Sequence, residues 1–228
     1  MVANAESNDS SKWSSAEQNY SQAVTLAKDE IPPDQLAMVT AYNGLALVYM
    51  QREEYERALQ ALNEAQRVAP GNFETNYVQG LVLLRTGRWQ EAEPLLENAL
   101  TAEPHNENVL SELGLLEWQH VHDLTKAAEF FHRALTIHTQ EDDFSASLYS
   151  NLGGVDADRG NFSAAIEEFG TAARVAHDDP EYHTNLANAL AAVGRYAEAR
   201  QEVELALQLV PGFPPAQATL DHLNQLSR

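Results

Sequence analysis

Two Glu-x-x-His steps carry the residues whose types and spacing come nearest to a metal site: Glu117 with His120, and Glu129 with His132. Side chains three residues apart in a helix lie on the same face, so each step brings a carboxylate and an imidazole together. Helical bundles hold pairs of metal ions with such steps on facing helices. A metal site here therefore requires helices that turn both steps toward each other.

The motifs of common enzyme classes are missing from the sequence. Its 228 residues include no cysteine, which excludes disulfides, thiol catalysis and cysteine metal sites. There is no glycine-rich phosphate loop, serine-nucleophile motif or His-Glu-x-x-His motif. His120 and His122 could form a weak adventitious metal site, but an exposed turn is the favoured interpretation. We expect no enzymatic activity, no cofactor and no metal.

The composition is strongly acidic, with a formal net charge of −20 and a sequence pI near 4.6. Nucleic-acid binding requires clustered Lys and Arg that displace the counterions of the phosphates, so nucleic acid is not an expected partner. A solvated acidic surface is the favoured interpretation of the charge, and steering of a basic protein partner is the alternative.

The N-terminal segment has neither a basic start nor an apolar run, so the sequence predicts no signal peptide, and it predicts no membrane span. We expect a soluble protein, with the cytoplasm favoured over the periplasm. Residues 1–11 are polar and small, and we expect them to form a disordered tail.

The helices that would position the chemical groups are organised as a repeat, and Phe73–Asn106 is its clearest copy. Its first half places the small Gly80 among larger apolar residues, and residues 86–88 interrupt the helical pattern. Its second half has four apolar or small residues at helical spacing: Trp89, Ala92, Leu96 and Ala99. Pro104 cannot continue the helix. Each copy is therefore predicted to form helix, turn and helix.

The small residue of the second helix gives the register of the other copies: Ala58, Ala92, Ala127, Ala165 and Ala199. The first and last of these spacings are 34 residues, whereas the middle two are 35 and 38. We expect one added residue near His120–His122, and four in the connection that follows Ile137, where the closing proline is missing. Loose stacking there predicts that Gln140–Ser145 is the most mobile internal segment.

This register divides the chain into repeats and flanking segments. A half repeat or N-terminal cap covers residues 12–28, repeats cover residues 39–72, 73–106, 107–141, 146–179 and 180–213, and a capping helix covers residues 214–228. From Lys12 to Arg228 the pattern resembles the tetratricopeptide repeat (TPR). The resemblance implies an all-α fold, an α-solenoid of about twelve helices whose antiparallel pairs form a right-handed superhelix.

The repeat frame separates the two Glu-x-x-His steps. Glu117 lies on the packed face of its helix, whereas Glu129 and His132 point away from the buried side, so the steps should not converge. Glu117 and Asp156 occupy a slot that other repeats fill with large apolar groups. We favour carboxylates that reach solvent across a loosened junction, and the alternative is an acidic pocket that includes Asp158.

The resemblance also implies that the first helix of each repeat lines a concave groove that binds extended peptides. Its expected binding residues are Asn43, Met50, Tyr77, Leu84, Arg85, Trp118, Gln119, Asn151, Asp158, Asn185 and Asn188. The N-terminal part is apolar and aromatic, with Leu47, Leu81 and Leu115 expected to pack between repeats. Asn151 and Asn185 resemble rungs of the amide ladder of the glycosyltransferase that adds N-acetylglucosamine to proteins. The lysines of the chaperone-binding class are missing.

We expect a non-enzymatic scaffold or adaptor that binds a protein or peptide segment in this groove. The segment should carry an apolar anchor, and its basic residues should face the acidic surroundings. A self-assembling scaffold is one alternative. An accessory domain of a larger enzyme, or of a secretion or assembly complex, is another.

Overall fold

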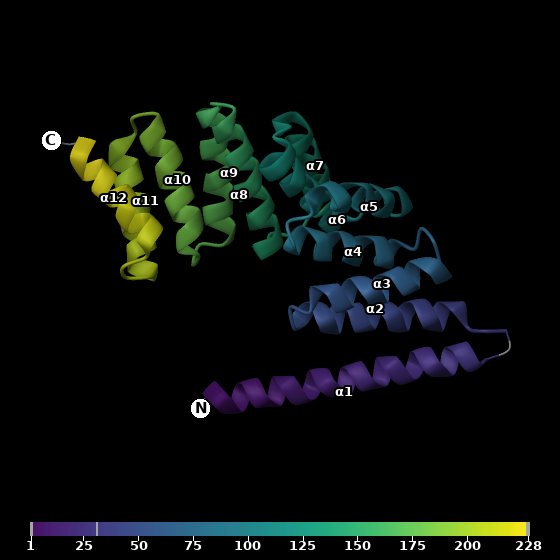
Figure 1. Ribbon diagram of the computed structural model, residues 1–228. Coiled ribbons are helices and arrows are strands. Elements are labelled where there is room, and N and C mark those ends of the chain that lie inside the picture. Colours follow the sequence, from purple (N-terminus) through teal and green to yellow (C-terminus); the bar gives the residue numbers. More distant parts are fainter. Residues whose placement is uncertain (1, 31, 227–228) are drawn as a thin grey trace. The chain divides into compact units, whose positions relative to one another are not determined.

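The computed structural model describes residues 2–30 and 32–226, with side chains from Lys12 onward, and all regular secondary structure in these residues is helical (Figure 1). Twelve α-helices and one π-helical turn are present in this described part, which confirms the predicted all-α fold. The contacts divide the chain into two compact units, unit 1 (Met1–Pro104) and unit 2 (His105–Arg228), which are described separately.

Unit 1 consists of five consecutive helices. They are α1 (Val2–Asp29), α2 (Gln35–Gln51), α3 (Tyr55–Val68), α4 (Phe73–Arg85) and α5 (Trp89–Ala102). Helix α1 begins at Val2, although the sequence predicts a disordered tail over residues 1–11; the side chains of these residues lie outside the described part. Glu17 fixes α1 to its neighbours, because its carboxylate pairs with Arg52 at 2.6 Å and Arg57 at 2.7 Å. The Arg52 hydrogen bond is the main reason that the pKa of Glu17 is lowered.

The core of unit 1 depends on close helix approach at small residues. Ala58, Ala65 and Ala92 are fully buried between larger side chains. A Cβ atom added at Gly80 would lie 2.8 Å from a terminal carbon of Leu96, so α4 and α5 can approach only because this position lacks a side chain.

Unit 2 has α6 (Glu107–Leu116), the π-helical turn η1 (Glu117–Val121), α7 (Leu124–Ile137), α8 (Asp143–Asp158), α9 (Phe162–Val175), α10 (Pro180–Ala192), α11 (Tyr196–Leu209) and α12 (Pro214–Leu226). Within this unit each helix packs against the next one (Figure 1). Phe131 is fully buried against Gly114, and Phe169 rests on Gly153 in the same way.

The helix-to-helix turns use one backbone conformation at equivalent positions. Glu53, Gly87, His122, Gly160 and Gly194 all have φ between 60° and 80°. Glycine adopts this left-handed conformation without a steric penalty, whereas Glu53 and His122 adopt it as side-chain-bearing residues. The one residue that repeat 107–141 adds is absorbed before this turn, where η1 continues α6 with π-helical hydrogen bonding.

The four-residue insertion between α7 and α8 is held by several side chains. Asp142 caps α8 and forms a capping box with Ser145, and Glu141 pairs with Arg174 at 2.9 Å. The segment that the sequence predicts to be loosely stacked therefore supplies the start of α8 and an ion pair to α9. Its mobility relative to the rest of the chain stays a prediction.

Candidate functional site

In unit 1 the first helix of each repeat, α2 and α4, presents an apolar surface. Met50 and Leu84 are half-buried and contact the core of unit 1. Leu47 is 38% exposed, whereas the sequence predicts that it packs between repeats. Leu47 and Leu81 occupy equivalent positions 34 residues apart, as do Met50 and Leu84. Because α2 and α4 pack against each other, the four side chains form one surface, the unit 1 strip.

The other predicted groove residues of unit 1 differ in their exposure. Tyr77 is half-buried and its ring stacks on that of Phe73, with 5.9 Å between centroids. Arg85 is exposed at the end of α4. Asn43 is 0% exposed: its Oδ1 accepts a hydrogen bond from Thr75 Oγ1 at 3.0 Å, and its Nδ2 donates to Glu74 Oε2 at 3.3 Å. The assignment of Asn43 to the binding surface is therefore wrong, because this side chain joins α2 to α4.

Trp118 in unit 2 joins two elements as well. Its Nε1 donates to Asp158 Oδ2 at 2.7 Å, and a Cβ atom added at Gly154 would lie 2.3 Å from its ring. Two predicted groove residues, Trp118 and Asp158, thus take part in one contact between η1 and α8, together with Gly154. Trp118 is still half-exposed and stays a proposed contact for a partner, but truncating it would also remove this contact with α8.

Two of the four predicted amides of unit 2 bridge neighbouring helices. Asn185 Nδ2 donates to Ser150 Oγ at 3.3 Å, which links α10 to α8. Asn188 Oδ1 accepts from Thr219 Oγ1 at 2.8 Å, which links α10 to α12. Asn151 is half-buried and Gln119 is exposed. The equivalent slots of Asn151 and Asn185 therefore differ in their contacts.

The carboxylates of Glu117 and Asp156 are buried, so the favoured prediction that they reach solvent is wrong. Glu117 is 2% exposed and Asp156 is 7% exposed. A buried charge requires a partner, and long cationic side chains supply it: Lys126 on α7, the helix after η1, and Arg159 at the C-terminal end of α8 itself. Lys126 Nζ lies 3.1 Å from Glu117 Oε1, and Arg159 Nη1 lies 3.5 Å from Asp156 Oδ1. Burial, followed by the charge of Asp156, raises the pKa of Glu168 on α9.

The two Glu-x-x-His steps do not converge in unit 2. Glu117 is paired with Lys126, whereas Glu129 and His132 are exposed on α7. His122 Nδ1 lies 3.2 Å from the carbonyl oxygen of Trp118. No cluster of three or more His, Asp or Glu side chains in the described part of the chain has the geometry of a metal site.

His138 forms an ion-pair junction with two carboxylates in unit 2. Its Nδ1 lies 3.1 Å from Glu107 Oε1, its Nε2 lies 2.9 Å from Asp142 Oδ1, and Phe144 meets its ring edge-on. Burial opposes protonation of the imidazole, but the hydrogen bonds to Asp142 and Glu107 outweigh it, so the pKa of His138 is raised above 6.5. The junction ties the start of α6 to the insertion before α8.

The stability of unit 2 should fall across the pH range in which His138 loses its proton. Its pKa is higher in the folded than in the unfolded chain, so its stabilisation is complete below about pH 6.5 and is lost as the pH rises through the raised value. Urea unfolding measured from pH 5.5 to 8.5 should show a steeper loss for the wild type than for His138→Gln. His132→Gln is the control, because His132 is exposed, and its stability should depend on pH as that of the wild type does. If the stability of His138→Gln shows this same pH dependence, His138 is not the group that links stability to pH.

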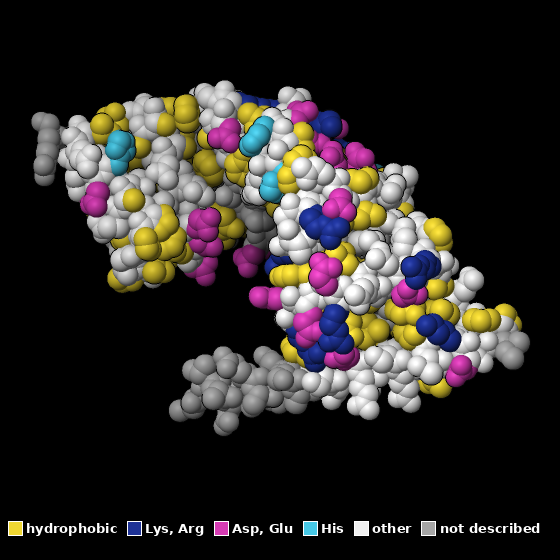
Figure 2. Space-filling view, in the orientation of Figure 1, with side chains coloured by type: hydrophobic (Ala, Val, Ile, Leu, Met, Phe, Trp, Pro, Cys, Tyr) yellow, Lys and Arg dark blue, Asp and Glu magenta, His cyan; other side chains and the backbone are white. Residues whose placement is uncertain are grey.

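Many basic side chains in both units form ion pairs with acidic ones. Arg57 with Glu17, Arg88 with Glu91 and Arg174 with Glu141 are examples, and Figure 2 shows acidic and basic side chains side by side over unit 1. Such pairs leave little positive potential for an anionic ligand, which agrees with the net charge of −20.

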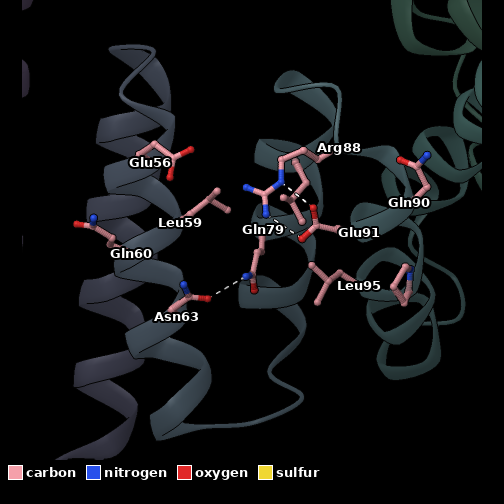
Figure 3. A pocket seen from close by; sticks show the side chains of 11 residues that line it. Glu56, Leu59, Gln60, Asn63, Gln79, Arg88, Gln90, Glu91 and Leu95 are labelled. Carbon is pink, nitrogen blue, oxygen red and sulfur yellow. Dashed lines mark hydrogen bonds and ion pairs between the residues drawn. The ribbon is translucent and has the colours of Figure 1, made fainter.

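A cleft of about 620 Å³ between α3, α4 and α5 is a feature that the sequence analysis missed (Figure 3). Leu59 and Asn63 of α3 face Leu95 of α5 across it, and Gln79 and Leu83 of α4 form part of its lining. The sequence did contain a signal for it. Gln79 occupies the slot in which the other repeats have leucine: Leu45, Leu113, Leu152 and Leu186.

Comparisons with known proteins agree on the repeat. The family model described as the N-terminal TPR repeats region of psidin matches residues 17–152, which is more than half of the chain. A tetratricopeptide-repeat model matches residues 152–214. Among the described residues, no helix combines the length and apolar character needed to cross a bilayer.

Individual relatives resemble the chain at low sequence identity. Protein O-mannosyl-transferase TMTC1 of Homo sapiens is 26% identical over 226 residues, covering 94% of this chain and 23% of that protein. The chain spans less than a quarter of the length of the curated relatives it matches. The structure of PilF from Pseudomonas aeruginosa has a TM-score of 0.72 at 21% identity, covering 84% of this chain and 85% of PilF. YrrB, described as a TPR protein with an unusual peptide-binding site, has a TM-score of 0.72 at 18% identity, covering 90% and 100%.

Proposed function

Because this chain belongs to the tetratricopeptide-repeat family, we propose that it is a non-catalytic scaffold that holds a segment of a partner protein against its first helices. Repeat arrays of this kind typically act as binding surfaces, and their specificity depends on a few exposed side chains. YrrB, which shares the fold, is described as having a peptide-binding site, and this supports the same class of function here.

The observation that carries the proposal is the unit 1 strip. Leu47 is 38% exposed on a helix whose other apolar residues are mostly buried, and Met50, Leu81 and Leu84 are half-exposed beside it. An apolar side chain of a partner, aligned along α2 and α4, would bury this surface at about 25 cal/mol per Å² of apolar area. The partner segment would therefore present an apolar anchor to unit 1.

Polar groups near the strip would orient the segment on unit 1. Tyr77 and Arg85 stand on the same helix as Leu84, and Arg85 is exposed at its end. Unit 2, taken by itself, would offer a partner hydrogen bonds from the exposed Gln119, Asp158 and Asn188 and from the half-exposed Trp118, Asn151 and Asn185. With a net charge of −20, basic residues that flank the anchor would meet an attractive field, which would raise the association rate more than the affinity.

Self-association is a second candidate function, favoured by apolar exposure on α11. Tyr196, Leu205, Leu209 and Val210 are each about two-fifths exposed along or just after this helix. Burying such side chains against a second copy would remove them from water. A third candidate role is that of an accessory repeat domain in a larger protein. It is supported by the match of this chain to 23% of the length of a mannosyl-transferase.

Replacing Leu47 with aspartate should weaken partner binding at least about tenfold, because a charge would enter the apolar contact that anchors the segment. Leu47 is substantially exposed, so the thermal midpoint should change little. The measurement is an affinity capture followed by titration of the captured segment against the purified variants.

Leu209→Asp is the matched control, since Leu209 is 40% exposed but lies on the second helix of its repeat. Its affinity for the segment should equal that of the wild type. If Leu209→Asp loses the partner and Leu47→Asp retains it, the binding surface is on α11 and the first-helix assignment is wrong.

A further inference from the structure

An aromatic ring of α1 covers α2 at a position where the other repeats have a side chain of their own. A Cβ atom added at Gly44 would lie 2.4 Å from the ring of Tyr20, so this ring rests directly on the backbone of α2. The equivalent residues of the other repeats are Val78, Glu112, Asn151 and Asn185. The glycine therefore lets a side chain of α1 reach the exposed face of α2.

A pocket of about 360 Å³ lies beside this ring, between α1 and α2. Tyr20 and Ala23 of α1 line it together with Leu36 and Ala37 of α2, and Asp34 is the one charged residue of its described lining. Leu36 is 75% exposed and Tyr20 is 37% exposed, so apolar surface of the lining is open to solvent. An apolar side chain of another molecule can therefore contact this lining from outside.

The pocket continues the unit 1 strip along the exposed face of α2. Leu36, Thr40 and Leu47 are separated by four and seven residues, which keeps them on one face of the helix, and all three are exposed. Asn43 and Gly44 flank this face, because successive helical residues point about 100° apart. Asn43 contacts α4 and Gly44 contacts α1. The exposed face of α2 between α1 and α4 is called the α2 trough below.

The length of the α2 trough favours a helical partner over an extended one. Leu47 follows Leu36 by eleven residues, which corresponds to about 16 Å along α2. A partner helix covers this distance with two of its own residues eleven positions apart, and these lie on the same face because eleven residues make about three turns. An extended segment covers it in about five residues, and residues five apart point to opposite sides.

Charged side chains distinguish the two ends of the α2 trough. Asp34 caps the start of α2, where its Oδ1 accepts from the backbone N–H of Ala37 at 3.0 Å. Glu74 is exposed in the first turn of α4, and Arg85 is exposed in its last turn. Helices α2 and α4 run in the same direction, because α3 runs back between them. One end of the trough is therefore acidic and the other is basic.

We propose that the α2 trough binds an amphipathic helix of the partner that runs antiparallel to α2. One apolar residue of this helix enters the pocket between α1 and α2, and a second, eleven positions earlier, contacts the unit 1 strip. Basic residues in its last turn lie beside Asp34 and Glu74, and its macrodipole opposes those of α2 and α4. The inference rests on the proposed function and adds the pocket, the helical form and the direction of the segment.

The test uses a synthetic library of helical peptides in which two leucines stand eleven positions apart and the last turn carries lysines. Wild type should retain a subset of the library, and Leu36→Ser should bind that subset at least about tenfold more weakly. Because Leu36 is largely exposed, the thermal midpoint should change little. Leu26→Ser is the matched control, since Leu26 is 60% exposed on α1 and is not part of the pocket lining.

Changing the peptide as well shows which leucine occupies the pocket. A retained peptide whose second leucine is replaced by serine should bind wild type and Leu36→Ser equally weakly, because the contact is already lost. Leu47→Asp should weaken the original and the shortened contact alike. A spin label at the basic end of the peptide should broaden the amide resonance of Ala37, at the start of α2, more than that of Thr86, which follows α4.

The proposal is overturned if wild type retains no peptide, or if Leu36→Ser binds the retained peptides as tightly as Leu26→Ser does. Stronger broadening of Thr86 than of Ala37 would overturn the direction of the helix. If Leu47→Asp loses the peptides and Leu36→Ser keeps them, the pocket is wrong and the unit 1 strip of the proposed function stands. If Leu36→Ser loses them and Leu47→Asp keeps them, the strip is wrong as the second contact.

Discussion

Replacing Phe131 with alanine should lower the free energy of unfolding of unit 2 by about 3–5 kcal/mol. Phe131 is the largest fully buried side chain of the described residues, and it packs onto α6 where Gly114 has no side chain. The cavity cannot be filled by a neighbour, because the facing position is a glycine whose helix is fixed by its own packing. Urea unfolding followed by circular dichroism gives the free energy directly.

Phe130 supplies the control for this experiment, since it precedes Phe131 on α7 but is only half-buried. Phe130→Ala should lower the free energy of unfolding much less, by about 1 kcal/mol, because the half-buried Phe130 side chain removes less apolar surface from water when the protein folds. In the opposite direction, Gly114→Ala would place a Cβ atom 2.7 Å from the Phe131 ring and should cost about 1–3 kcal/mol through overpacking. Equal effects for the two phenylalanines would show that the register of α7 is wrong.

The helix pattern could be predicted from the sequence because it depends on local chemistry that repeats. Gly80, Gly114 and Gly153 recur opposite Leu96, Phe131 and Phe169, and such pairs can be found in the sequence at a spacing of 16 or 17 residues without knowing the fold. The turns follow for the same reason, since a residue with positive φ falls at one position of each repeat. Even the added residue near His122 could be counted, although its placement in a π-helical turn could not.

The side-chain contacts were harder to predict because each depends on a neighbouring repeat. Asn43 is hydrogen-bonded to Thr75, and Trp118 to Asp158, although each pair is separated by more than thirty residues in the sequence. The repeat position shows which face of a helix a residue occupies, but not whether a side chain of the next helix covers it. For this reason Asn43 was assigned to a surface from which Thr75 and Glu74 in fact exclude it.

The buried carboxylates were predicted incorrectly for a related reason. A single repeat shows that Glu117 takes an apolar slot, and burial of an unpaired charge is unfavourable, so exposure is the simplest expectation. Lys126 lies nine residues later on the next helix, and its flexible stem brings Nζ to the carboxylate while half of its side chain stays in solvent. Reach of this kind depends on the path of η1, which the repeat pattern does not specify.

Replacing Lys126 with methionine should destabilise unit 2 by about 3 kcal/mol, because the Glu117 carboxylate would remain buried without a charged partner. Its Oε2 already lacks a hydrogen bond among the described residues, so the pair with Lys126 is the main compensation that the chain provides. Glu117→Leu should act in the opposite direction and stabilise unit 2 by about 1–4 kcal/mol, since leucine restores the large apolar group that Leu83 and Leu190 place in this slot.

The double variant gives the decisive comparison for this pair. Once Glu117 is leucine, Lys126→Met removes no needed partner, so the double variant should match Glu117→Leu within about 0.5 kcal/mol in urea unfolding. Arg195→Met is the surface control: Arg195 and Glu198 form an exposed pair whose loss should cost about 0–1 kcal/mol. If Lys126→Met lowers the free energy of unfolding no more than Arg195→Met does, the ion pair is not what stabilises the Glu117 carboxylate. The helices around Glu117 would then open enough in solution for water to solvate the carboxylate.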